Sequence, residues 1–188
     1  DFAGQLLDGK GISPQKGLRD HPLFHGKIQY YSARDGKMTV GLYTITPERV
    51  ITLFPDVGLP QFRLARKLFK KLGKTWVEEA REAYAAEGYQ GVGRLADYKM
   101  KHVIEALLLK LSSLSSDLFP PSDYSFVDSI AQNLCKGISC LVDISGISSD
   151  EQNKITCLTA SAVAQHYKRT WEEEYEEWQK LPTLLITL

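Results

Sequence analysis

Hydrophobic and basic positions separate most cleanly in residues 60–74. At about 100° per residue, the apolar side chains fall on one side of a helical wheel and the cations on the other. The apolar side comprises Phe62, Leu64, Ala65, Leu68, Phe69 and Leu72. The basic side comprises Arg63, Arg66, Lys67, Lys70, Lys71 and Lys74. The pattern predicts an amphipathic helix that buries one face and holds its cations in water.

Helical periodicity continues through much of the chain. It predicts helices over residues 46–54, 75–87, 94–112, 123–142 and 150–180. Thr46 and Pro47 are typical of a helix start, and Gly73 is typical of a helix end. Thr75 with Glu78, and Ser149 with Gln152, have the spacing of capping boxes. Residues 103–111 are apolar on nearly every side, which predicts the central buried helix.

Alternating β-branched and aromatic residues predict two strands, over residues 27–32 and 38–45. Asp35 and Gly36 lie between them and favour a tight turn, so we expect a β-hairpin. The predicted fold class is therefore mainly α: a multi-helix globular domain of about six or seven helices with one small N-terminal hairpin.

Composition suggests where the chain divides. Residues 1–26 are rich in glycine and proline, which indicates an N-terminal arm or loop. Residues 27–112 form a hairpin plus a basic helical subdomain, and residues 123–188 form an acidic helical subdomain with an apolar C-terminal tail. The serine- and proline-rich residues 112–122 would join them. A single compact domain is the alternative.

Bulk composition limits the class of protein. The chain has 188 residues, of which 43% are hydrophobic, enough to bury a core. The chain has three cysteines and no CxxC pair: Cys135, Cys140 and Cys157. This pattern predicts reduced thiols in an intracellular, cytoplasmic protein. No apolar run approaches the ~18 residues of a membrane span. Because the sequence begins at Asp1, we expect a fragment of a longer chain.

Charge is distributed unevenly. Residues 1–110 contain 18 Lys and Arg against 12 Asp and Glu, whereas residues 111–188 contain 5 against 11. The two halves could therefore face each other, within one molecule or between copies, or face different partners. Among the C-terminal glutamates lies an aromatic stripe that is a candidate for self-association into a homo-oligomer. It comprises Tyr167, Trp171, Tyr175 and Trp178. Ordinary core packing of these rings is the alternative.

Candidates for chemistry are few. Gly91, Gly93 and Arg94 could bind an anion at a helix start, although a helix stop followed by a turn explains the same residues. His21 and His25 are four apart, but Pro22 opposes the helix that metal binding would need, so no metal or other cofactor is predicted. No local signature of catalysis occurs, which leaves enzyme activity uncertain and disfavoured.

The charge pattern favours a non-enzymatic interaction module. We expect the basic side of residues 60–74 to bind an acidic protein surface. The first alternative is RNA or DNA on the same side chains, helped by further cations and by tyrosines that can stack on bases. These are Arg81, Arg94, Lys99, Lys101, Tyr30, Tyr31, Tyr43, Tyr89 and Tyr98. An enzyme of unrecognised type is the second alternative, and a merely solubilising surface is the plainest explanation.

Overall fold

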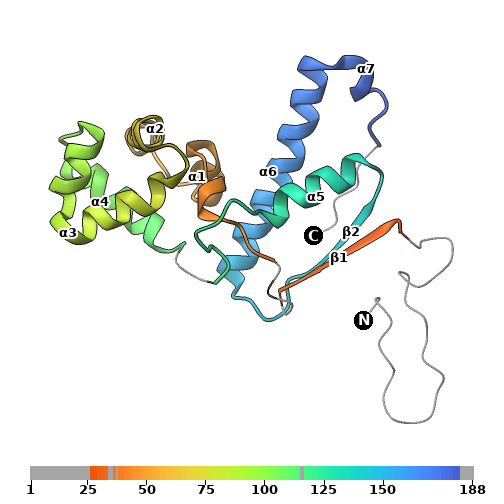
Figure 1. The fold of residues 1–188 in the computed structure, drawn as a ribbon, viewed down its shortest axis with the longest axis horizontal. Helices are drawn as coiled ribbons and strands as arrows, with labels where there is room; N and C mark the ends of the chain where they lie inside the picture. The colour runs from red at the N-terminus through yellow and green to blue at the C-terminus, as the bar shows by residue number, and fades with distance from the viewer. Residues whose placement is uncertain (1–25, 34–35, 37, 115–116, 183–188) are drawn as a thin grey trace, which may run out of the picture. The chain divides into compact units, whose positions relative to one another are not determined.

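The computed structural model of the chain describes residues 26–33, 36, 38–114 and 117–182 (Figure 1). The predicted N-terminal arm, apart from Gly26, and the tail beyond Pro182 lie outside these residues. The described part is mostly helical with one small sheet, which confirms a mainly α fold with a minor β element. None of its helices combines the length and hydropathy that crossing a membrane requires.

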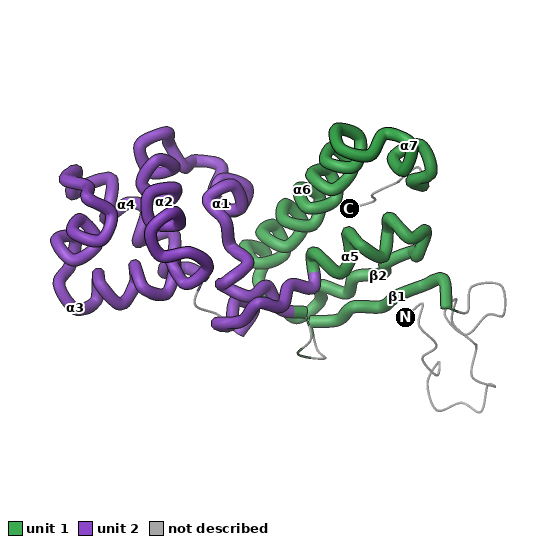
Figure 2. Tube along the Cα trace, turned by 45° about the horizontal axis from the view of Figure 1, so that its top comes forward, with its two compact units in different colours: residues 1–38, 127–188 green, residues 39–126 purple. Residues whose placement is uncertain are grey.

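The chain forms two compact units (Figure 2). Unit 1 contains residues 1–38 and 127–188, and unit 2 contains residues 39–126. The units divide after residues 38 and 126, whereas the sequence suggested divisions after residue 26 and within residues 112–122. A unit built from both ends of the chain cannot be recognised from local composition.

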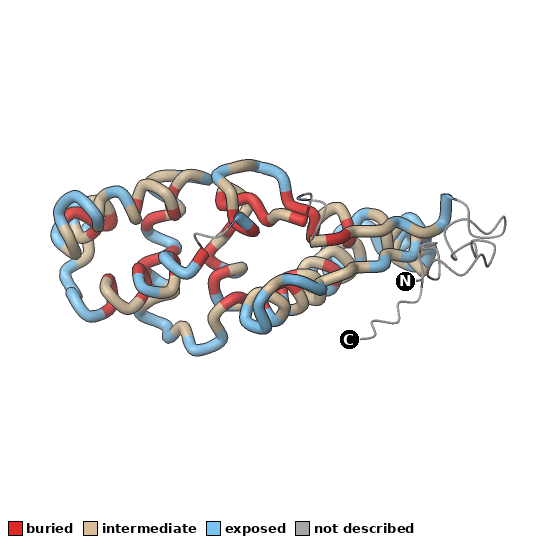
Figure 3. Tube along the Cα trace, turned by 90° about the horizontal axis from the view of Figure 1, so that it is seen from below, coloured by how far each residue is buried: buried red, intermediate tan, exposed pale blue. Residues whose placement is uncertain are grey.

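Unit 2 is a helical body. It contains η3 (Leu42–Thr44), α1 (Pro47–Leu53), α2 (Leu59–Leu72), η4 (Gly73–Thr75), α3 (Trp76–Ala96) and α4 (Lys101–Ser112). Helix α2 packs against α1, α3 and α4. One face of α4 is buried and includes Val103, Ile104 and Leu107, whereas Leu109 is 76% exposed, so the helix is not buried on nearly every side. Figure 3 colours each residue by burial and shows buried residues recurring along the helices.

The ends of α1 and α2 follow the sequence signals. The Thr46 hydroxyl accepts a hydrogen bond from the Arg49 amide, and Pro47 begins the helix as predicted. Helix α2 ends at Gly73, whose φ of 67° lies in a region that side chains with a Cβ avoid. The basic helix therefore forms within a residue or two of the predicted bounds.

Trp76 anchors the beginning of α3. Its side chain is fully buried, and its indole Nε1 donates to the Ile45 carbonyl at 2.7 Å. The predicted capping box of Thr75 and Glu78 is wrong, because η4 occupies this position and the Thr75 hydroxyl donates to Leu72 and Glu79 instead. Glu78 accepts a hydrogen bond from the Tyr43 hydroxyl.

The helix stop predicted at Gly88 is confirmed, whereas the predicted start of the next helix at Arg94 is wrong. Helix α3 is kinked at Gly88, where φ is 60° and ψ is −150°, but helical backbone resumes and continues to Ala96. It ends at Asp97, which adopts the left-handed conformation, and α4 begins at Lys101 rather than at Arg94. Gly88 has nearly the same φ and ψ as Gly73 at the end of α2, so it ends a first helical segment, and a second segment continues to Ala96.

The sheet lies in unit 1 and corrects the predicted hairpin. Strand β1 (Ile28–Ser32) pairs in parallel with β2 (Ser139–Asp143), in a register that places Ile28 opposite Ser139. Residues 38–45 do not form the expected second strand. The Val40 amide donates to the Leu118 carbonyl at 2.8 Å, so a distant loop satisfies the backbone that a hairpin would have used.

The remaining helices of unit 1 are shorter or interrupted relative to expectation. Helix α5 (Phe126–Cys135) begins at the last residue of unit 2 and ends before Gly137, whose φ is 73°, so the predicted helix over 123–142 is wrong at both ends. Helix α6 (Ser149–Glu173) begins with a capping box of Ser148 and Glu151, one residue before the predicted pair. The chain breaks at Glu174 before α7 (Tyr175–Trp178).

Candidate anion-binding face

The basic face of α2 is a set of six cationic residues, five on the solvent side of that helix and Lys74 in η4 directly after it. They are Arg63, Arg66, Lys67, Lys70, Lys71 and Lys74, and all are exposed. On the opposite side, Leu64, Ala65 and Leu68 have no solvent exposure. The buried side fixes the rotation of the helix about its axis, so the cations point into water together.

Most of these cations have no acidic partner. Among the described residues, Lys74 alone forms an ion pair, with Asp123 at 3.0 Å. Lys67 donates to the Asp97 carbonyl at 3.1 Å and its Nζ lies 5.6 Å from the Tyr98 ring centroid. Neither contact neutralises a full charge, so the face keeps most of its positive potential.

The cause is the sequence of α2 itself. Leu59–Leu72 contains no Asp or Glu, so no cation has an acid three or four residues away on the same helix. Like charges at these spacings repel by roughly 0.2–0.5 kcal/mol a pair. An anion bound along the face would relieve that repulsion.

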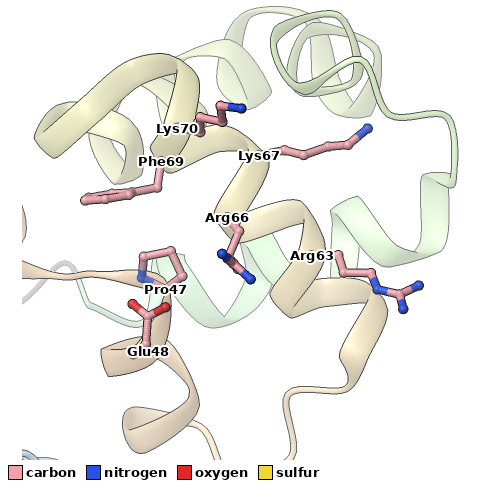
Figure 4. A pocket seen from close by; sticks show the side chains of 7 residues that line it. All are labelled: Pro47, Glu48, Arg63, Arg66, Lys67, Phe69 and Lys70. Carbon is pink, nitrogen blue, oxygen red and sulfur yellow. The ribbon is translucent and has the colours of Figure 1, made fainter.

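A groove of about 660 Å³ lies between α1 and α2 (Figure 4). It is lined by Pro47, Glu48, Arg63, Arg66, Lys67, Phe69 and Lys70. The Arg66 guanidinium points toward Pro47 and Glu48, whereas Arg63 and Lys67 extend away from them. Glu48 is exposed and forms no ion pair with any described residue. The groove thus has a strongly basic wall and one acidic residue on its other side.

The other predicted anion site is not assembled. Gly91 is buried within α3, and the Gly93 carbonyl accepts hydrogen bonds from the amides of Asp97 and Tyr98. Arg94 forms an ion pair with Glu87. Gly91 lies three residues after the break at Gly88, whereas Gly93 and Arg94 lie in the last turn of α3, where carbonyls are free. The three residues therefore do not lie together at a helix start, as the sequence predicted.

The predicted aromatic stripe is divided by the break at Glu174. Trp171 and Tyr175 are 52% and 54% exposed, and the Tyr175 and Trp178 rings stack with centroids 5.6 Å apart. The Tyr167 hydroxyl donates to the Pro182 carbonyl at 2.6 Å. The stripe therefore presents two exposed rings instead of one continuous helical edge.

The surrounding glutamates are largely paired within their own segment. Lys168 lies 3.7 Å from Glu172, Arg169 lies 3.5 Å from Glu173, and Lys180 lies 2.6 Å from Glu177. These exposed pairs are individually weak, but they reduce the net potential of the acidic segment. This segment differs in that respect from the basic face of α2.

Sequence reasoning missed a carboxylate that joins the two strands. Asp143 accepts hydrogen bonds from the Ser145 amide at 2.9 Å, the Tyr30 hydroxyl at 3.0 Å and the Ser32 hydroxyl at 3.3 Å. Ser145, followed by Tyr30, stabilises the charged form and lowers the Asp143 pKa to about 2. Ser32 lies 111 residues and Tyr30 113 residues before Asp143 in the chain, so no local motif reveals these contacts.

Thiol and metal chemistry find little support in the described residues. All three cysteines are free, and burial raises the pKa of Cys135 and brings that of Cys140 to about 11, which disfavours reactive thiolates at both positions. No three metal-ligating side chains cluster within the described part of the chain. His21 and His25 lie outside it.

No protein-family model matches the chain, and no curated protein or solved structure shows significant similarity to it.

Proposed function

We propose that this chain is a non-enzymatic interaction module that binds an acidic partner through the basic face of α2. The observation that supports this proposal best is that five of its six cations have no carboxylate partner among the described residues. A solubilising surface commonly mixes both signs of charge, whereas this face carries one sign. The buried opposite side fixes the helix backbone that carries the cations, so binding does not have to order that backbone.

Single-stranded nucleic acid is the second candidate partner. The groove between α1 and α2 combines cations with the apolar side chains of Pro47 and Phe69. Sequence-tolerant binding of single strands uses this combination, in which cations track the phosphates and apolar or aromatic surfaces receive the bases. A flat acidic protein surface would make no use of such a hollow.

Self-association is a further part of the proposal. The exposed rings of Trp171 and Tyr175 support it, because large exposed aromatic side chains are typical of contact surfaces. The free cysteines suit a reducing, intracellular setting.

The test is reversal of charge on the basic face. Anisotropy titrations would compare the wild type with a K67E/K70E/K71E variant, using a fluorescent polyglutamate peptide and a fluorescent single-stranded oligonucleotide. We expect the variant to lose about a hundredfold in affinity for whichever probe the wild type binds. A K136E/K168E/K180E variant has the same net charge and exposed substitution sites, and should retain binding.

Two outcomes would contradict the proposal: wild type that binds neither probe, or equal losses in both variants. Circular dichroism must show that the reversed variant stays folded, as expected for exposed positions. Salt then separates the partners. Affinity for a single strand should fall with a log–log slope of about −0.7 per neutralised phosphate.

A further inference from the structure

The groove between α1 and α2 has two chemically different sides. Arg66 reaches across it from α2 toward Pro47 and Glu48 on α1 (Figure 4). Arg66 and Glu48 form no ion pair within 4.0 Å, although they carry opposite charges. The Arg66 Cζ lies 5.8 Å from the Phe62 ring centroid, a contact with the face of the guanidinium that leaves its N–H groups for a ligand. Arg66 offers several N–H donors in a planar fork, and Glu48 offers only acceptor oxygens.

A uniform polyanion does not suit this arrangement. Phosphate or carboxylate groups satisfy the α2 side, but any anion that extends toward α1 meets the Glu48 carboxylate. The ligand that fits both sides presents an anion to Arg66 and an N–H donor to Glu48. Between them, the partly exposed Phe69 supplies the apolar surface for a flat ring, because Pro47 lines the groove but is itself buried.

A nucleotide unit has this combination of groups. We propose that the groove is a subsite for one nucleotide of a single-stranded nucleic acid, with its phosphate on Arg66 and its base amine on Glu48. This inference rests on the proposed function of the basic face, and it assigns Glu48 as the residue that determines base preference. The volume of about 660 Å³ lies within the range of small-molecule sites.

The proposal predicts which base is favoured. Cytosine has an amine donor at the position where uracil has a carbonyl oxygen. A carboxylate accepts a hydrogen bond from the cytosine amine, whereas it repels the uracil carbonyl. Wild-type protein should therefore bind oligocytidine about tenfold more tightly than oligouridine of equal length.

The experiment measures both affinities by fluorescence anisotropy with oligoribonucleotides about twelve residues long. Glu48→Ala should reduce the cytidine-to-uridine ratio to near one, because affinity for oligocytidine falls with the lost hydrogen bond and affinity for oligouridine rises with the lost repulsion. Glu82→Ala is the matched control, since Glu82 is an exposed acid on α3 that does not line the groove, and its ratio should stay at the wild-type value.

Arg66→Lys tests the other side of the subsite. It retains the charge but removes the planar fork, so affinity for both strands should fall about fivefold. Arg63→Lys should have a smaller effect, because Arg63 points away from α1.

The outcomes separate this inference from the function on which it rests. If wild type binds both strands equally, or Glu48→Ala leaves the preference intact, the subsite is wrong while the basic face remains a binding surface. If polyglutamate binds and neither strand does, the partner is an acidic protein and the nucleotide subsite is wrong. If no probe binds, both proposals fail.

Discussion

Each unit contains one strongly charged helical segment, and the two differ in how their charges and apolar residues are used. On α2 the apolar side is buried and the cations are mostly unpaired. At the end of α6 and in α7, aromatic rings are exposed and several glutamates pair with nearby cations. A run of like charge therefore has different consequences in the two segments. Of the two segments, the basic face of α2 keeps more of its charge unpaired among the described residues.

The largest expected effect is the loss of stability when an apolar side chain of each segment is truncated. Leu68 on α2 is fully buried, whereas Trp171 on α6 is 52% exposed. Leu68→Ala should lower the free energy of unfolding by about 2–5 kcal/mol, because it leaves a cavity in the core. Trp171→Ala should cost less than about 1 kcal/mol, since little packing is lost. Urea denaturation followed by circular dichroism gives both values. A larger loss for Trp171→Ala would reverse the comparison.

An effect of intermediate size concerns unit 1, where the contribution of Asp143 to stability should depend on pH. The lowered pKa of Asp143, about 2, means that its charged form stabilises the folded state. This contribution is present above the ordinary carboxyl pKa of about 4 and is lost as pH falls toward about 2.

The Asp143 side chain is partly solvated, so we expect a contribution of only about 1 kcal/mol. Urea denaturation at pH 5 and at pH 2.5 would measure it. The stability difference between wild type and Asp143→Asn should shrink as pH falls. An equal difference at both pH values would show that the carboxylate does not join the strands in this way.

The smallest effect tests the charge pairing directly. Arg63→Glu should stabilise the protein by about 0.5 kcal/mol, because the new acid lies three and four residues before Arg66 and Lys67. Lys168→Glu should destabilise it by a similar amount, because Lys168 pairs with Glu172. Thermal unfolding at low salt should show the opposite signs, and both shifts should shrink in high salt. Equal signs would mean that the two surfaces do not differ in their local pairing.

The sequence predicted α1 and α2 well because their signals are local, whereas it began α4 at Arg94 instead of Lys101. Thr46, Pro47 and Gly73 act within a few residues, and the apolar period of α2 needs no distant partner. Helix α6 begins one residue before its predicted start. Ser148 and Ser149 both fit a cap in the sequence, and only the folded geometry selects Ser148.

The sheet and the groove could not be predicted because they depend on distant partners. In the sequence, Asp35 and Gly36 favoured a local hairpin. In the structure, Ile28 pairs instead with the distant Ser139. Gly137 was the one local sign that α5 ends before β2. The cations of α2 were identifiable from their spacing, but the position of Glu48 opposite Arg66 follows from the packing of α1 on α2.

Lysine footprinting tests most directly whether the basic face of α2 is the binding surface. The protein would be acetylated with an amine-reactive reagent, with and without a saturating acidic probe, and each lysine quantified by mass spectrometry. The proposal predicts that Lys67, Lys70 and Lys71 lose reactivity when the probe binds, while Lys168 and Lys180 react as before. Protection of Lys168 and Lys180 instead, or unchanged reactivity at Lys67, Lys70 and Lys71 with the probe bound, would contradict it.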